Sequence, residues 1–100
     1  RDVGGYLRDG LRTLAQRYEI IGDVRGAGLF IGVELVTDRT TKAPATAQTA
    51  RLVNGLREKR VLISAAGPHA NVLKIRPPLV FSREHADVFL TAMDEVLGTV

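Results

Sequence analysis

The spacing of apolar residues changes several times along the chain, and this alternation constrains the fold more than any other feature. Three segments place apolar residues three and four positions apart, which is the period of an amphipathic helix. They run from Val3 to Tyr18, from Ala45 to Lys59 and from Arg83 to Leu97. Between them lie short apolar segments rich in β-branched and aromatic residues, a pattern that predicts strands.

The predicted strands are Leu29 to Val36, Val61 to Ile63 and Val72 to Arg76. Polar residues from Thr37 to Ala43 predict a loop, and Pro44 suits the first turn of the following helix. The order is therefore helix, strand, helix, strand, strand, helix. Three or four strands backed by helices predict a small α/β (α+β) sandwich of two layers with a mostly antiparallel sheet. We assign all 100 residues to one domain, because that length supports one core.

Composition and charge exclude several kinds of site and partner. The absence of cysteine excludes disulfides, thiolate zinc sites, iron–sulfur clusters and cysteine nucleophiles. The formal net charge of +3 comes from scattered basic residues, so we expect neither a nucleic-acid nor a membrane partner. No apolar run could span a bilayer, and no leader pattern opens the chain. We expect a cytoplasmic domain, and the start at Arg1 indicates a piece of a longer polypeptide.

The run Gly26-Ala27-Gly28 partly matches the glycine-rich fingerprint of dinucleotide-binding proteins. That fingerprint needs a third glycine where Ile31 stands, and it opens a helix, whereas this run precedes a predicted strand. We therefore predict a bend or a bulge at the start of the strand.

The residue types of a hydrolase triad occur together at Ser82, His85 and Asp87. All three lie near one helix start, where a nucleophile and its base cannot converge on a substrate, so we assign Ser82 to the helix N-cap. His69 and His85 are the only histidines, which is too few ligands for a zinc site, and we predict no metal site. We expect His69 to be an exposed turn residue.

The segment from Val72 to Pro78 carries two cations on a predicted strand. Alternation places Lys74 and Arg76 on one face and the apolar residues between them on the other. Two neighbouring cations ahead of a double proline suit an anion-binding site. A strand face exposed to solvent accounts for the same pattern.

Several runs of sequence match the motifs of one enzyme family, in order and with the usual spacing. Residues 21–35 read IGDVRGAGLFIGVEL, which is similar to a DVRGxGLxxGxEL signature, and residues 61–63 resemble the GLLI strand that follows it. Residues 72–80 resemble an xxRxxPPLxx strand, and the helix after Ser82 resembles a final helix. Over its whole length the chain resembles the C-terminal small domain of class III aminotransferases, which are fold-type I pyridoxal-phosphate enzymes.

This resemblance implies the substrate-side domain of an enzyme that transfers an amino group between an amine or amino acid and a 2-oxo acid. In the family, the Schiff-base lysine and the groups that hold pyridoxal phosphate lie in the large domain. The resemblance therefore assigns no catalytic and no cofactor-binding residue to this chain. It also implies that the isolated chain is inactive and that the full-length enzyme is a homodimer, with this domain packed on its own large domain.

The family's small domain often supplies an arginine for the substrate carboxylate, three residues before the first proline of the PPL motif. Here Lys74 stands in that place and Arg76 lies beside the prolines, so we expect both to bind an anionic group of a small-molecule substrate. The run NVLKIRPPL resembles the branch that includes alanine–glyoxylate aminotransferases and phospho-lyases acting on phosphorylated amines. A phospho-lyase is therefore one alternative function, and a stand-alone ligand-binding or interaction module is another.

Overall fold

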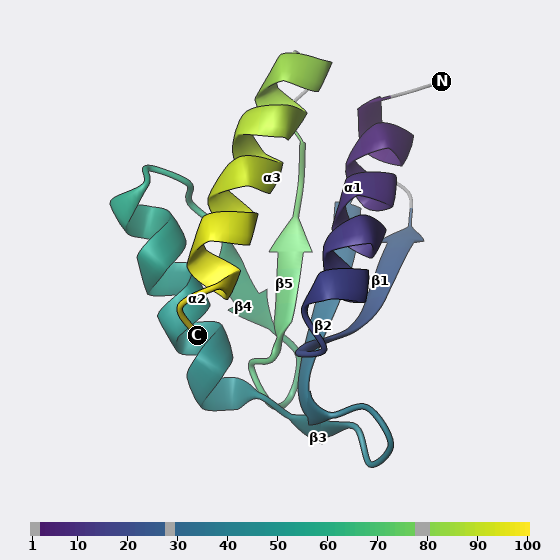
Figure 1. The fold of residues 1–100 in the computed structure, drawn as a ribbon, viewed down its shortest axis with the longest axis vertical. Coiled ribbons are helices and arrows are strands. Elements are labelled where there is room, and N and C mark those ends of the chain that lie inside the picture. The colour runs from purple at the N-terminus through teal and green to yellow at the C-terminus, as the bar shows by residue number, and fades with distance from the viewer. Residues whose placement is uncertain (1–2, 28–29, 78–80) are drawn as a thin grey trace.

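Helices and strands alternate through the computed structural model, which describes residues 3–27, 30–77 and 81–100 (Figure 1). The helices are α1 (Val3–Arg17), α2 (Thr46–Glu58) and α3 (Arg83–Leu97). The strands are β1 (Ile21–Ala27), β2 (Phe30–Asp38), β3 (Ala43–Pro44), β4 (Ser64–Ala66) and β5 (Val72–Ile75).

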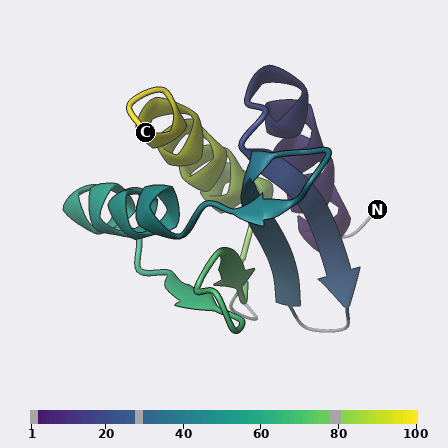
Figure 2. The same cartoon turned by 90° about the horizontal axis from the view of Figure 1, so that it is seen from below.

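The sheet is antiparallel throughout the described residues and has the strand order β1-β2-β5-β4, with the two-residue β3 paired to β2. The three helices cover one face of this sheet, and its other face is left open by the described part of the chain (Figure 2). The predicted two-layer sandwich with a small antiparallel sheet is therefore confirmed.

The core lies between the helices and the sheet, where the apolar stripe of each helix meets the inward-facing strand residues. Fully burying one such leucine, valine or phenylalanine contributes about 1.5–3 kcal/mol to stability. The buried side chains include Leu7, Leu11, Leu14, Val33, Leu35, Leu52, Leu56, Leu73, Phe89 and Met93. The predicted helical stripes therefore form the core, and each helix begins and ends within one residue of its predicted bounds.

The strand β1 was not predicted from the sequence, because a bulge disturbs the alternation of its residues. The register of β1 against β2 shifts between Ile21 and Asp23, so Ile21 and Val24 both face the core although they are three residues apart. The bulge that we predicted near Gly26 is wrong at this residue, because Gly26 pairs regularly with Ile31, while Gly28 lies outside the described residues.

Gly26 has a packing role instead. A Cβ atom placed on it would overlap the side chain of Arg8, which crosses the strand from α1. A larger residue at this position would therefore require the flexible Arg8 side chain to move.

The strand predicted at residues 61–63 is wrong, and the strand β4 begins at Ser64. The backbone N–H of Val61 donates to the Leu56 carbonyl of α2 at 2.8 Å, and Arg60 before it has a positive φ of 64°. Val61 therefore belongs to the C-terminal turn of α2. Continuing the β4–β5 register from the Ser64–Lys74 pair would place Val61 opposite Pro77, which has no N–H to donate.

The loop predicted from residue 37 is shorter than expected, because β2 continues to Asp38 and β3 begins at Ala43. Pro44 ends β3 rather than starting α2. A proline is tolerated on such a short edge strand, and the following Ala45 N–H donates to the Leu35 carbonyl at 3.1 Å.

Arg39 ties the end of α1 to the sheet. Its guanidinium donates to the carbonyl oxygens of Glu19 and Ile21 at 3.0 Å, to that of Tyr18 at 3.3 Å, and to that of Ala15. The last carbonyls of a helix have no partners within the helix, and a cation near them also complements the helix dipole. The Arg39 side chain therefore provides donors for the backbone carbonyls in the connection between α1 and β1.

We predict that Arg39→Ala lowers the free energy of unfolding by about 1–3 kcal/mol, because it leaves these carbonyls without their charged donor. Urea unfolding followed by circular dichroism measures this change. As a matched control, Arg51→Ala on the exposed face of α2 should change stability by less than about 0.5 kcal/mol. Equal effects of the two substitutions would contradict the role of Arg39.

Polar contacts join α1 to α3 at one end of the helix pair. The hydroxyl of Tyr18 donates to Asp94 Oδ1 at 2.5 Å, and Arg17 Nη1 lies 2.7 Å from Asp94 Oδ2. The hydrogen bond from Tyr18, followed by that from Arg17, lowers the pKa of Asp94 below its ordinary value of 3.8.

We predict an acid-dependent loss of stability from this contact. Because the pKa of Asp94 is lower in the folded chain, its contribution is present above the unfolded pKa and is lost as pH falls through the folded pKa. Tyr18→Phe removes the hydrogen bond that lowers the pKa of Asp94 most. The urea midpoint of this variant should therefore fall less than that of the wild type between pH 6 and pH 2. Parallel curves for the two proteins would contradict the prediction.

Candidate functional site

The strand β5 separates apolar from cationic side chains as its alternation predicts. Leu73 is fully buried and Ile75 is 7% exposed, and both belong to the core under the helices. Lys74, between them, is half-buried, and Arg76 just after the strand is exposed. The core therefore fixes which side of the sheet Lys74 occupies.

Lys74 and Arg76 line one cavity of about 160 Å³ at the end of β5. Its other walls are apolar: Leu7, Val61, Leu62, Ile63, Ile75, Pro77, Phe81 and Phe89. Within residues 3–27, 30–77 and 81–100, no carboxylate forms an ion pair with either cation. Because Leu7, Ile75 and Phe89 belong to the core, the cavity lies on the helix side of the sheet, whereas alternation places the Lys74 side chain on the other face. The two predicted residues therefore lie together at the end of β5, and neither has a carboxylate partner among the described residues.

The structure also places three residues around Lys74 that the sequence analysis did not select. Gly32 of β2 and Ser64 of β4 lie opposite Lys74 in the two flanking strands. The Lys74 ammonium lies 4.8 Å from the centroid of the Phe30 ring. The sequence carries no signal for these neighbours, because they depend on the register between strands that are distant along the chain.

A cation elsewhere on this face is already neutralised. Arg25 of β1 lies opposite Gly32 of β2. The Arg25 Nη1 atom is 3.0 Å from Asp23 Oδ2 and 2.9 Å from Glu34 Oε1. The hydrogen bond to Glu34 is the main cause that raises the pKa of Arg25, so this side chain stays charged and paired. Lys74 and Arg76 are the better candidates for an anion from outside.

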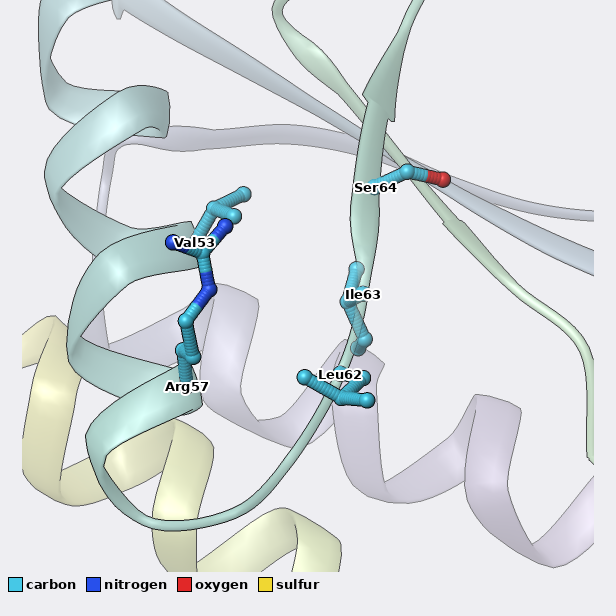
Figure 3. Close-up of a pocket in the computed structure, with 5 residues that line it drawn as sticks. All are labelled: Val53, Arg57, Leu62, Ile63 and Ser64. Atoms are coloured by element: carbon cyan, nitrogen blue, oxygen red, sulfur yellow. The ribbon is translucent and has the colours of Figure 1, made fainter.

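A second hollow lies between α2 and the segment that leads into β4 (Figure 3). Val53, Arg57, Leu62, Ile63 and Ser64 line it, and the Ser64 hydroxyl points away from α2 in the view. Leu62 is 81% exposed there. None of the residues predicted for the site lines this hollow.

The lysines of the chain do not fit a site for a carbonyl coenzyme such as pyridoxal phosphate. Such a site needs a lysine, a partner for the ring nitrogen and donors for the phosphate in one pocket. Lys42 is exposed on a turn, Lys59 pairs with Glu95 at 3.3 Å, and Lys74 lies in a cavity whose described walls contain no carboxylate. The described residues therefore do not form a coenzyme site.

The triad-like residues have structural roles. Ser82 Oγ accepts from the His85 N–H at 3.2 Å, and His85 Nδ1 accepts from the Ser82 N–H at 3.1 Å, which forms a capping box. Asp87 turns to α1 and accepts from the Tyr6 hydroxyl at 2.5 Å. The assignment of Ser82 to the N-cap is confirmed, and its hydroxyl and the carboxylate do not converge on one histidine.

His69 lies in an exposed turn, as predicted. Its carbonyl accepts from the Thr46 hydroxyl at 2.6 Å, which ties the turn to the start of α2. Among the residues that the structure describes, no group of histidine, aspartate and glutamate could hold a metal ion. No helix in that part of the chain is long and apolar enough to cross a membrane.

Comparison with known proteins gives consistent matches over nearly the whole chain. Residues 1–97 match the family described as aminotransferase class-III. The chain is 50% identical over 92 residues to alanine–glyoxylate aminotransferase 2 homolog 2, mitochondrial, of Arabidopsis thaliana, covering 92% of this chain and 19% of that protein. It is 42% identical over 98 residues to ethanolamine-phosphate phospho-lyase homolog 1 of Caenorhabditis elegans, covering 97% and 21%.

A solved structure matches as well. The amine transaminase from an uncultivated Pseudomonas species, in its form with bound pyridoxal phosphate, superposes with a TM-score of 0.83 at 33% identity. The match covers 97% of this chain and 22% of that one. The chain therefore spans about a fifth of the length of the proteins it matches.

Proposed function

Since the chain belongs to the class III aminotransferase family, we propose that it is the substrate-side small domain of a pyridoxal-phosphate-dependent aminotransferase. The parent enzyme would transfer an amino group between an amine or amino acid and a 2-oxo acid. Pyridoxal phosphate, when held by the rest of the parent chain, supplies the electron sink for this chemistry. The role of the present residues is to bind and orient the substrate.

The observation that carries the proposal is the pair of cations, Lys74 and Arg76, which lie together at the end of β5 without carboxylate partners among the described residues. Buried apolar neighbours fix the strand on which Lys74 lies, so its charge is held at one place on the sheet. We propose that Lys74, assisted by Arg76, binds an anionic group of the substrate.

A phospho-lyase acting on a phosphorylated amine is the second candidate function. The observation that favours it is the lysine itself, because an ammonium is a compact point charge, whereas arginine offers a planar fork that matches a carboxylate. The C. elegans relative is named as an ethanolamine-phosphate phospho-lyase, which supports the same reading. Assays with L-alanine plus glyoxylate and with ethanolamine phosphate distinguish the two activities.

We predict that Lys74→Ala in the parent enzyme raises KM for the anionic substrate about tenfold or more, because one charge-assisted hydrogen bond is lost. Lys74→Arg keeps the charge and should retain most of the affinity. Steady-state kinetics with both substrates measure this effect. A wild-type KM for Lys74→Ala would show that this lysine is only a solvated side chain.

Arg76→Ala distinguishes substrate binding from an interdomain contact. If Arg76 assists Lys74, KM rises while the melting temperature stays unchanged. If Arg76 instead pairs with the large domain, the melting temperature of the parent enzyme falls and KM does not change. Measuring both quantities for this variant decides between the two roles.

We predict that the 100-residue chain alone is inactive and forms no specific covalent adduct with pyridoxal phosphate. Its lysines lie apart and lack the other groups that such a site requires. Borohydride reduction after incubation with the coenzyme, followed by mass spectrometry of peptides, tests this. A stoichiometric adduct at a single lysine would overturn the prediction.

We propose that the partners of the domain are its own large domain, a second copy of the parent enzyme and the small-molecule amino donor and acceptor. The open face of the sheet suits the first of these partners, because the described helices leave it uncovered (Figure 2). We also propose the cytoplasm as its compartment. Imaging of the tagged full-length parent tests this against the mitochondrial location named for the Arabidopsis relative.

A further inference from the structure

Phe30 and Lys74 meet on the open face of the sheet, although they are far apart in the sequence. Phe30 begins β2, and Lys74 lies in the adjacent strand β5. Gly32, two residues after Phe30, is the direct partner of Lys74, so Phe30 and Lys74 are diagonal neighbours on one face. The ammonium lies 4.8 Å from the ring centroid, within the range of a cation–π contact.

Gly32, which carries no side chain, lies between them on this face. A side chain at position 32 would stand directly beside Lys74 on the same face. With glycine there, no side chain separates the lysine stem from the phenylalanine ring. The other flanking partner of Lys74 is Ser64, whose side chain is small and exposed.

An aromatic ring holds a cation without neutralising it. A carboxylate partner would compete with an anionic substrate for Lys74, as Asp23 and Glu34 do for Arg25 on the same sheet. The face of a phenylalanine ring attracts the ammonium but leaves its full charge for an incoming anion. A lysine on a flexible stem also loses less freedom on binding when its position is already restricted.

We propose that Phe30 is a positioning residue for Lys74: its ring holds the ammonium over the open face of the sheet, ready for the anionic group of the substrate. This inference rests on the proposed function, because it gives Phe30 a role through Lys74. Phe30 of β2 would thus contribute to substrate affinity although the cation that binds the substrate lies in β5. Arg76, which has no such ring contact among the described residues, would be the more mobile of the two cations.

The first arm of the test follows the contact itself by nuclear magnetic resonance of the 100-residue chain. A ring 4.8 Å from the ammonium should shift the ε-methylene signals of Lys74 upfield relative to those of Lys42, which serves as the internal reference. Phe30→Leu should abolish this shift, and Phe30→Tyr should retain it. A Lys74 signal that Phe30→Leu leaves unchanged overturns the proposal.

The second arm measures function in the parent enzyme with L-alanine and with ethanolamine phosphate as probes. Phe30→Leu should raise KM for the accepted probe about two- to fivefold and leave kcat nearly unchanged, while Phe30→Tyr restores the wild-type KM. Melting temperatures of both variants separate lost positioning from lost stability. A merely structural role of Phe30 would lower the melting temperature and leave KM as it is, and this outcome overturns the proposal.

Comparison with Lys74→Ala separates failure of this inference from failure of the proposed function. If Lys74→Ala raises KM and Phe30→Leu does not, Lys74 binds the substrate without help from the ring, and only the inference fails. If neither substitution changes KM, the proposed role of Lys74 fails, and the positioning role fails with it.

Discussion

The burial of alternate residues of β5 under the helices is the constraint on which the rest of the site depends. Leu73 and Ile75 face a core built by all three helices, and a shift of the strand by one residue in either direction would bring Lys74 into that core. Since an unpaired lysine in the core is very unfavourable, the register is strongly fixed. The same packing that stabilises the fold therefore holds Lys74 on the open face.

The cations of the chain are used in different ways. Arg39 satisfies backbone carbonyls at the end of α1, and Arg25 pairs with two carboxylates on the open face of the sheet. Lys74 has a ring beside it and no carboxylate partner among the described residues. A cation with a structural role is normally paired with a carboxylate or bonded to carbonyls. Lys74 is half-buried without a carboxylate partner among the described residues, which favours a role in ligand binding.

The helices could be predicted from sequence because their stripes have a long, regular period, and Ser82 marked the start of α3. The strands were harder. The bulge at Ile21 hid β1, and residues 61–63 have a strand-like composition although the N–H of Val61 belongs to the end of α2. The local pattern of apolar residues shows neither a shift in the register between two strands nor a backbone hydrogen bond made to a helix elsewhere in the chain.

The candidate site was predictable only in part, for the same reason. Strand alternation alone placed Lys74 opposite the core side chains of β5. The contact with Phe30 was not predictable, because it arises from the pairing of β2 with β5, which are separated by β3, α2 and β4 in the chain. Resemblance to a family suggested an anion-binding role for Lys74, but it gave no information about what holds the lysine in place.

The most direct test of the central claim is a crystal structure of the parent enzyme with an anionic substrate analogue bound. Our account predicts that Lys74 Nζ lies within 4 Å of an oxygen of the anionic group, in the range of an ion pair. It also predicts that the ring of Phe30 remains against the lysine in the complex. An analogue bound elsewhere, with Lys74 in solvent or paired to a carboxylate of the large domain, would contradict the account.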